Sequence, residues 1–132
     1  MTLKDIVTSK PAKMVSCRTD CGLAQAITLM ESDSVGSVLV MDDDDRLVGI
    51  FTQQDIMHCL EKQIPIHDTV IGSVMTTSPL TLDGSVDISV AVSLMSEKKI
   101  RHLPITENGQ IIGVISYRDL ISYLLPEILF ME

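Results

Sequence analysis

The 132-residue sequence contains no tryptophan, two tyrosines and two phenylalanines, although 45% of its residues are hydrophobic. Aliphatic side chains and methionine must therefore fill the core of what is, by its length, about one domain. No stretch approaches the roughly 20 apolar residues that span a bilayer, and no 7–15-residue apolar run follows the first residues as in a secretion signal. We expect an aliphatic globular protein of the cytoplasm.

Positive charge is also scarce, with ten lysines and arginines against 18 acidic residues and a net charge of −8. Such a surface repels the phosphates of nucleic acids and anionic lipids, so neither is an expected partner. The odd number of cysteines, Cys17, Cys21 and Cys59, and the lack of a CxxC spacing exclude a disulfide framework and a common zinc pattern. We expect reduced thiols.

Sequence signatures of catalysis are missing as well. The chain has no G-x-S-x-G, no Walker G-x-x-x-x-G-K and no G-x-G-x-x-G, so we do not expect an enzyme. The acidic run 42–45 fails as a calcium loop, because Leu47 stands where glycine is needed and Gln53 where the bidentate glutamate belongs. His58 and Cys59 belong to no known metal-ligand spacing, so no metal site is expected either.

What the chain does contain is an internal repeat. A shift of 65 residues aligns two helical faces with the spacing i, i+3, i+4, i+7, namely Leu23, Ala26, Ile27 and Met30 with Ile88, Ala91, Val92 and Met95. Asp20 and Ser85 precede these faces and are the expected N-caps. Short apolar segments follow at 35–40 and 100–105, and after a turn at 47–51 and 111–115.

A final helix closes each copy. These helices begin near Thr52 and Ser116, and Pro126 is expected to interrupt the second. Their predicted buried residues are Ile56 and Leu60 in the first copy, and Leu120, Tyr123 and Leu124 in the second. Each copy therefore reads strand, helix, strand, strand, helix.

This order predicts an α+β fold of two βαββα motifs. They are expected to pack as a pseudo-twofold pair, with the sheets facing each other, the helices outside and two equivalent clefts. The expected ranges are 1–62 for the first motif, 63–73 for a connector and 74–125 for the second motif, followed by an apolar tail over 126–132.

The most specific repeated element is G-h-h-[T/S]-x-x-D-h, found at 49–56 and again at 113–120. A capping interpretation accounts for Thr52 and Ser116, whose hydroxyls can accept from the N–H three residues on. A functional interpretation uses the acids, because a carboxylate at a helix start can accept hydrogen bonds from both hydroxyls of a ribose while the free N–H groups suit phosphate. From the motif alone both interpretations stay open.

Together with the run Ile-Arg-His-Leu-Pro-Ile at 100–105 and Val-Met-Thr at 74–76, these duplicated segments resemble a tandem pair of CBS domains, a regulatory module. The resemblance covers nearly the whole chain. It implies that Asp55 and Asp119 bind an adenosine ribose with Thr52 and Ser116 beside them. It further implies that the backbone of the first strands, around Met14-Val15 and Pro79-Leu80, lines the adenine, and that Arg101 and His102 contact phosphate. Arg118, next to Asp119, is well placed to help, and Pro104 in the run 100–105 is a further expected binding residue.

The two copies differ in charge. The second carries the cationic cluster Lys98, Lys99, Arg101, His102 and Arg118, where the first has Asp33, Ser34, Gly36, Ser37 and Gln54. We therefore expect the second copy to supply the phosphate contacts. The alternative is that these residues are ordinary surface cations of an acidic protein.

Two functions follow from these observations. The first is a regulatory sensor of an adenosine-containing ligand (AMP, ADP, ATP, NAD or S-adenosylmethionine) that requires no cofactor and acts on a separate target protein. The alternative is a protein interaction module whose clefts are empty or filled by side chains, for example by Val35 or Val38. A homodimer is expected in either case, through the apolar tail and the last helix of each motif.

Overall fold

The computed structural model describes residues 1–9 and 13–129. Internal contacts divide the chain into two compact units, Lys13–Pro79 and Leu80–Glu132, the second of which also contains Met1–Ala12. We call them the 13–79 unit and the 80–132 unit. Compared with the ranges expected from the sequence, the first twelve residues and residues 74–79 are exchanged between the two halves.

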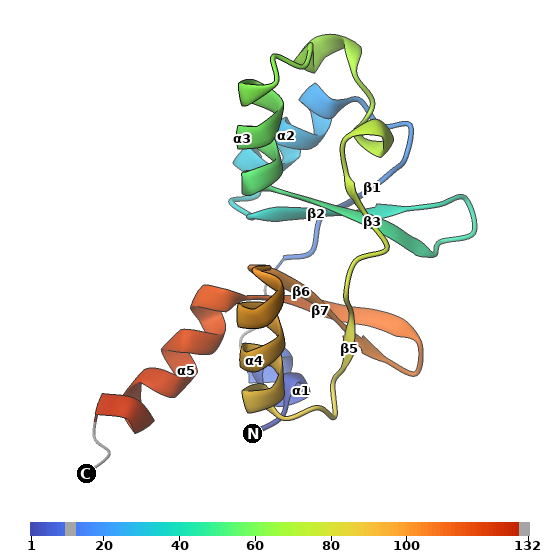
Figure 1. The fold of residues 1–132 in the computed structure, drawn as a ribbon. Helices are drawn as coiled ribbons and strands as arrows, with labels where there is room; N and C mark the ends of the chain where they lie inside the picture. Colours follow the sequence, from blue (N-terminus) through green and yellow to red (C-terminus); the bar gives the residue numbers. More distant parts are fainter. Residues whose placement is uncertain (10–12, 130–132) are drawn as a thin grey trace. The chain divides into compact units, whose positions relative to one another are not determined.

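The 13–79 unit is a four-stranded sheet whose helices α2 and α3 lie on one face (Figure 1). The strand order is β1-β2-β3-β4, with β1 parallel to β2 and the other neighbours antiparallel. Its elements are β1 (Ser16–Arg18), α2 (Leu23–Ser32), β2 (Ser37–Met41), β3 (Leu47–Thr52), α3 (Gln53–Glu61), the 3-10 turns η1 (Ile66–Asp68) and η2 (Ile71–Ser73), and β4 (Thr76–Thr77).

The 80–132 unit is a three-stranded sheet in the order β5-β6-β7, with β5 parallel to β6 and β6 antiparallel to β7. Its elements are α1 (Leu3–Ser9), β5 (Leu82–Asp83), α4 (Ile88–Lys98), β6 (His102–Glu107), β7 (Gln110–Ser116) and α5 (Tyr117–Leu129). The predicted order of strand, helix, strand, strand, helix is therefore confirmed in both halves, and the fold is α+β. None of the described helices has the length and apolar content to cross a bilayer.

The segments that begin the two matching halves of the sequence, α1 and the residues from η2 onward, are exchanged: α1 packs in the 80–132 unit, and the segment from η2 packs in the 13–79 unit. This exchange explains how the units divide. The Leu3 N–H donates to the Val86 carbonyl at 3.0 Å, and the Ile71 N–H donates to the Cys21 carbonyl at 2.8 Å. A 68-residue shift relates the two donors and a 65-residue shift the two acceptors. Leu3 and Ile71 are both fully buried, so each segment anchors itself in the core that it joins. The sequence repeat had not revealed this exchange, because both segments are short and differ in residue type.

The predicted helical faces form the two cores. Leu23, Ala26 and Met30 are buried in α2, and Ile88, Ala91 and Met95 are buried in α4, while Ile27 and Val92 pack at the margins. The sheet contributes a layer of apolar residues beneath them, including Val38, Val40 and Phe51 in one unit and Leu103, Ile105 and Ile115 in the other. Val38 thus serves the core of its own unit, with Val35 packed against it.

The expected N-caps were wrong. Helix α2 is preceded by Gly22, and α4 is capped by Asp87, whose side chain accepts from the Ser89 N–H at 3.0 Å. The Ser85 N–H instead donates to Asp83 Oδ2 at 2.9 Å, so Ser85 belongs to the turn before α4 and does not cap the helix. Asp20 lies exposed in the corresponding turn, two residues too early to cap α2.

Three further expectations need correction. Leu60 is 59% exposed, and Cys59 is the buried residue of α3, because the buried face continues from Ile56 by three residues instead of four. Pro126 lies inside α5, which runs on to Leu129; a proline removes one N–H donor but does not by itself end a helix. Met14–Val15 and Pro79–Leu80 precede the first strands, which begin at Ser16, directly after Val15, and at Leu82, two residues after Leu80. The side chains of the apolar tail beyond Pro126 lie outside the description.

Candidate functional site

The acid of the first motif, Asp55, caps the helix that carries it. The backbone N–H of Thr52 donates to Asp55 Oδ2 at 2.8 Å, and the Thr52 hydroxyl donates to the same oxygen at 3.3 Å. Thr52 is the N-cap of α3 and Asp55 its third residue, so the pair forms a capping box. Within the described part of the chain, Oδ1 of Asp55 receives no hydrogen bond, so this half-buried carboxylate keeps one oxygen for another donor.

The acid of the second motif, Asp119, is arranged differently. Here the helix start is capped by Ser116, whose Oγ accepts from the Asp119 backbone N–H at 3.1 Å. No hydrogen bond to the Asp119 carboxylate occurs among the described residues, although the side chain is half-buried. The capping interpretation therefore accounts for the hydroxyl in this motif and leaves the acid unexplained.

His102 lies next to this acid. It begins β6 and pairs with Ser116 of β7, and the Asp119 charge acts on its imidazole. Its Nδ1 is buried and has no hydrogen-bond partner among the described residues, an arrangement that is uncommon in folded proteins. Burial, aided by the Arg101 charge, lowers the pKa of His102 below its ordinary value, and Asp119 only partly opposes this. The imidazole is therefore neutral at pH 7.

The remaining residues that the resemblance implies fall into buried and exposed sets. Val15 is 7% exposed and its carbonyl accepts from the Leu39 N–H at 2.9 Å, whereas Met14 is 45% exposed. Pro104 is fully buried in β6. Arg101 and Arg118 are exposed, and Pro79 and Leu80 are half-buried. The structure thus brings Arg101, His102, Ser116 and Asp119 together in one unit and Thr52 with Asp55 in the other.

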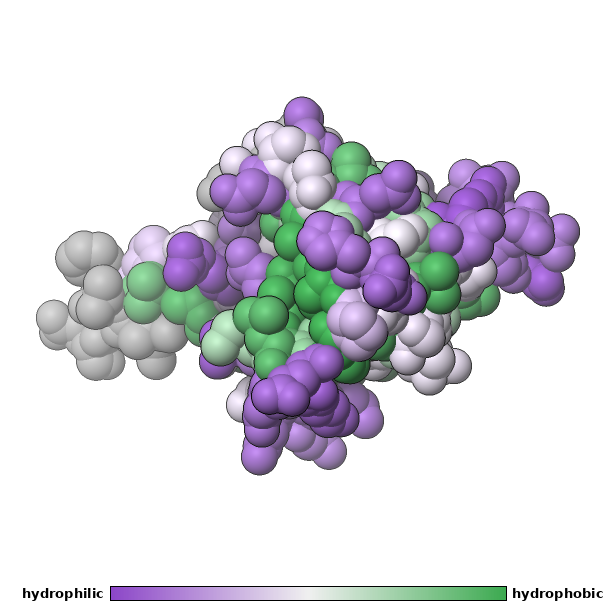
Figure 2. All heavy atoms as spheres, turned by 90° about the horizontal axis from the view of Figure 1, so that it is seen from above, coloured by the Kyte–Doolittle hydropathy of each residue, from purple (hydrophilic) through white to green (hydrophobic). Residues whose placement is uncertain are grey.

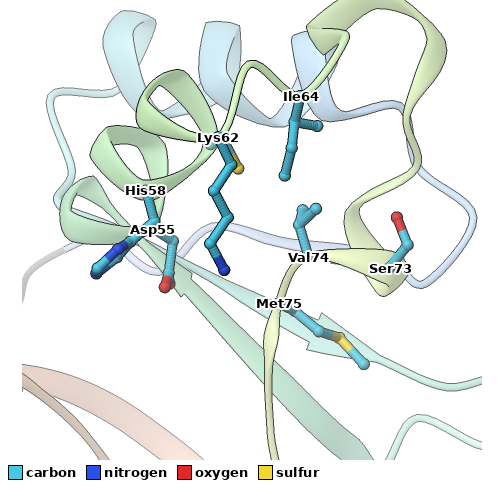
Figure 3. Close-up of a pocket in the computed structure, with 8 residues that line it drawn as sticks. Asp55, His58, Lys62, Ile64, Ser73, Val74 and Met75 are labelled. Atoms are coloured by element: carbon cyan, nitrogen blue, oxygen red, sulfur yellow. The ribbon is translucent and has the colours of Figure 1, made fainter.

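A cavity of about 400 Å³ lies beside α3 in the 13–79 unit. Figure 3 shows charged side chains of α3 on one side and Ile64, Val74 and Met75 on the other. Its lining consists of Asp55, His58, Cys59, Lys62, Ile64, Ser73, Val74 and Met75. Sequence reasoning had singled out only Asp55 as a binding residue. The i, i+4, i+7 spacing of Asp55, Cys59 and Lys62 is the signal that could have identified the lining residues of α3 and its C-cap; the residues from later segments carried no such signal.

Close packing explains why both copies of the repeated motif begin with glycine. A Cβ added to Gly49 would stand 2.3 Å from Met75 Sδ, and a Cβ added to Gly113 would stand 2.8 Å from Val7 Cγ1. Met75 and Val7 occupy equivalent places in the exchanged segments, each four residues after the buried anchor, Ile71 or Leu3. Each glycine is therefore the point at which the exchanged segment contacts the sheet.

Metal binding receives no support from the described residues, which contain no group of three or more His, Cys, Asp or Glu able to hold an ion. Asp42 serves its own turn, since its Oδ1 accepts from the Asp44 and Arg46 N–H groups at 2.9 Å each. The Arg18 guanidinium also contacts this turn through the Asp42 carbonyl. The three cysteines are unpaired, and burial next to Cys21 raises the pKa of Cys17 to about 12.

Comparison with known proteins identifies the family. The model of the CBS domain matches residues 3–62 and again 71–126, so that each match begins at one of the exchanged segments. A solved CBS-domain structure is 30% identical and superposes with a TM-score of 0.88, over 95% of this chain and 98% of the other. A protein with CBS domains from Burkholderia ambifaria is 27% identical, with a TM-score of 0.89 over 96% of each chain. The chain belongs to the CBS-domain family and contains a pair of these domains.

Sequence relatives place the same module in proteins of different size. An uncharacterized protein of Methanopyrus kandleri is 28% identical over 121 residues, which are 90% of this chain and 58% of that protein. The inosine-5'-monophosphate dehydrogenase of Methanocaldococcus jannaschii is 30% identical over 123 residues, but these make up only 22% of the enzyme. The match therefore concerns a module, and the dehydrogenase activity of that relative does not transfer to this chain.

Proposed function

We propose that this CBS-domain pair is a regulatory module that senses an adenosine-containing ligand. The observation that carries the proposal is the Asp119 carboxylate, which lies half-buried at the start of α5, near His102, and receives no hydrogen bond from any residue that the structure describes. A carboxylate in this position can accept hydrogen bonds from the two vicinal hydroxyls of a ribose.

Two proteins of the same fold support an adenosine ligand. The structure of a CBS-domain protein from Pyrobaculum aerophilum, with a TM-score of 0.84 and 21% identity, contains AMP. Another CBS-domain pair, with a TM-score of 0.81 and 20% identity, contains 5'-methylthioadenosine and S-adenosyl-L-methionine. The moiety common to these ligands is adenosine. AMP, ADP, ATP, NAD and S-adenosylmethionine remain candidates for this chain.

The other contacts follow from chemistry. Arg101 and Arg118 are exposed cations next to the second motif's acid, and they suit the phosphates of a nucleotide. We assign the adenine lining to the segments that precede β1 and β5 and to Pro104. In the first motif, Asp55 takes the ribose with Thr52 beside it, and no arginine accompanies this acid. The segments assigned to adenine are Met14–Val15 and Pro79–Leu80.

The test is thermal stabilisation by AMP, ADP, ATP, NAD and S-adenosylmethionine. A ligand that binds only the folded state adds RT ln(1 + [L]/Kd) to its stability, about 2.7 kcal/mol at a hundredfold excess. Asp119→Ala should weaken binding by about tenfold or more, and by more than Asp55→Ala does, because charged hydrogen bonds are worth about 1.5–3 kcal/mol. No stabilisation by any adenosine compound at millimolar concentration contradicts the proposal.

Within this proposal the nucleotide is a regulatory ligand and no cofactor is needed. The module acts by regulation and not by catalysis, and it passes its signal to a target protein. A cytoplasmic location suits the three unpaired cysteines, since thiols stay reduced there.

A homodimer is the second part of the proposal, supported by exposed apolar residues on α3. Met57 and Leu60 are 68% and 59% exposed, although α3 is only nine residues long. Figure 2 shows apolar side chains gathered on the face over the helices of the 13–79 unit, with hydrophilic residues around them. Contiguous apolar surface of this kind usually marks an interface.

Light scattering at micromolar concentration tests the dimer. The expected mass is twice 14.5 kDa. A double change of Met57 and Leu60 to glutamine should return the monomer mass, whereas Val90→Gln, at an exposed apolar position of α4, is the control and should leave the dimer intact. A monomer mass for the unaltered protein, with and without nucleotide, excludes the dimer.

A further inference from the structure

The cavity beside α3 depends on one small residue. Cys59, which is 2% exposed, lines it. The corresponding residue of α5, 64 positions later, is Tyr123, which packs against the core of the 80–132 unit and whose hydroxyl lies 2.9 Å from Ser9 Oγ. One motif therefore carries an aromatic ring where the other leaves open space.

Two opposite charges, one at each end of α3, line this space. Asp55 lies in the first turn of α3, and Lys62 directly follows its last residue. Figure 3 shows the Lys62 side chain extending from the end of the helix back toward Asp55. The ion pairs of the described residues include neither of them, and Thr52 occupies only Oδ2 of Asp55. One carboxylate oxygen and one ammonium group are thus available to a ligand.

The opposite side of the cavity is apolar. Ile64 and Val74 point into it in Figure 3, and Met75 is held there by its close packing on Gly49. A volume of about 400 Å³ is at the lower end of the range for small-molecule sites, which combine an apolar lining with a few polar groups. The cavity is large enough for a small metabolite and too small for a folded partner.

The charges restrict the kind of ligand. A simple organic anion would meet the Asp55 carboxylate, and a simple cation would meet the Lys62 ammonium, so each would gain one attraction and one repulsion. A molecule that carries an ammonium group and a carboxylate on the same carbon, together with an apolar group, satisfies both residues and covers the apolar side. A free α-amino acid has this chemistry.

We infer that the cavity of the 13–79 unit binds a free α-amino acid with an apolar side chain. Its ammonium group contacts Asp55 Oδ1, its carboxylate contacts Lys62, and its side chain lies against Ile64 and Val74. The inference does not rest on the adenosine proposal, whose main acid, Asp119, belongs to the other unit and does not line this cavity. At Asp55 a ribose and the amino acid would use the same carboxylate and would exclude each other.

The first test is calorimetry with L-leucine, L-methionine and L-phenylalanine on the full chain. Two analogues of leucine separate the charges: 3-methylbutylamine lacks the carboxylate and 4-methylpentanoate lacks the ammonium group. At least one amino acid should bind, and its affinity should exceed that of either analogue by about tenfold or more. Absence of binding by all three amino acids up to about 10 mM, or equal binding of leucine and an analogue, overturns the inference.

Variants then locate the site. Lys62→Met should weaken amino-acid binding by about tenfold or more, while Lys98→Met, at an exposed lysine that ends α4, should not change it. Cys59→Tyr introduces the ring of the other motif and should abolish binding; Lys62→Met keeps the test decisive if that variant does not fold. Binding that survives both changes overturns the inference.

The same variants distinguish this site from the nucleotide site. Asp119→Ala should reduce AMP affinity and leave leucine affinity unchanged, whereas Lys62→Met should do the reverse. Asp55 takes part in both proposals, so its substitution is not used to separate them. Loss of leucine binding in Asp119→Ala would contradict a site confined to the 13–79 unit.

Discussion

Replacing the two motif acids by alanine should have unequal effects on stability without any ligand. In Asp55→Ala the backbone N–H of Thr52 loses its 2.8 Å acceptor. In Asp119→Ala no described hydrogen bond is lost, because Ser116 Oγ caps α5 through the backbone N–H of residue 119. Both changes remove a negative charge from a helix N-terminus, worth about 0.3–1 kcal/mol in each case, so their difference isolates the capping bond.

A capping bond of this kind contributes about 1 kcal/mol. For a chain of this size that difference corresponds to about 4 °C in melting temperature. We therefore expect Asp119→Ala to lower the free energy of unfolding by about 0.5 kcal/mol and Asp55→Ala by about 1.5 kcal/mol. Urea unfolding and calorimetry of the ligand-free proteins at neutral pH measure both values.

Asp55→Asn is the matched control. Its side-chain oxygen can still accept from the Thr52 N–H, so it should recover most of the capping contribution while losing the charge. Equal destabilisation by the two alanine variants, or a larger loss at Asp119, would refute the assignment of the cap to the acid in the first motif and to the hydroxyl in the second.

Two other residues give predictions of the same kind. Burial lowers the pKa of His102 in the folded protein below its ordinary value of about 6.5. As the pH falls, the imidazole is therefore protonated more readily in the unfolded chain than in the folded one. The free energy of unfolding should then fall between pH 7 and pH 5.5. In His102→Gln this decline should be smaller, as measured by urea unfolding across that range; an unchanged decline would assign it to other groups. Gly49→Ala should cost about 1–3 kcal/mol, because the new Cβ would stand 2.3 Å from Met75 Sδ. Adding Met75→Ala should recover part of that loss in a double-mutant cycle, and additive losses would show that the two residues do not interact.

Much of the fold was present in the sequence because the repeat doubles every local signal. The faces of α2 and α4 follow from apolar residues at helical spacing, and the same pattern occurs once in each copy, which makes coincidence improbable. The strands β2, β3, β6 and β7 follow from short apolar runs on either side of polar turns. The two acids were identified for the same reason, since a motif repeated at a constant shift stands out even when each copy is weak.

What escaped sequence reasoning depended on contacts between distant residues. Nothing local reveals that Leu3 belongs to the core of the second motif, because its carbonyl partner, Val86, lies 83 residues away. Whether Leu60 or Cys59 faces the core depends on where α3 lies against the sheet. The cap of α4 could not be chosen between Ser85 and Asp87, since both residue types cap helices well and the turn determines which one is free to do so.

The sequence by itself determined which chemical groups recur, Thr52 with Asp55 and Ser116 with Asp119, and in which type of element each occurs. Only the tertiary structure decided how each group is used. It bound the Asp55 carboxylate to the Thr52 N–H, left the Asp119 carboxylate without a donor among the described residues, and opened a cavity along α3. The physical reason is that residue type and spacing specify local hydrogen bonding and periodicity, whereas burial and unmet hydrogen bonds arise only when remote segments pack together.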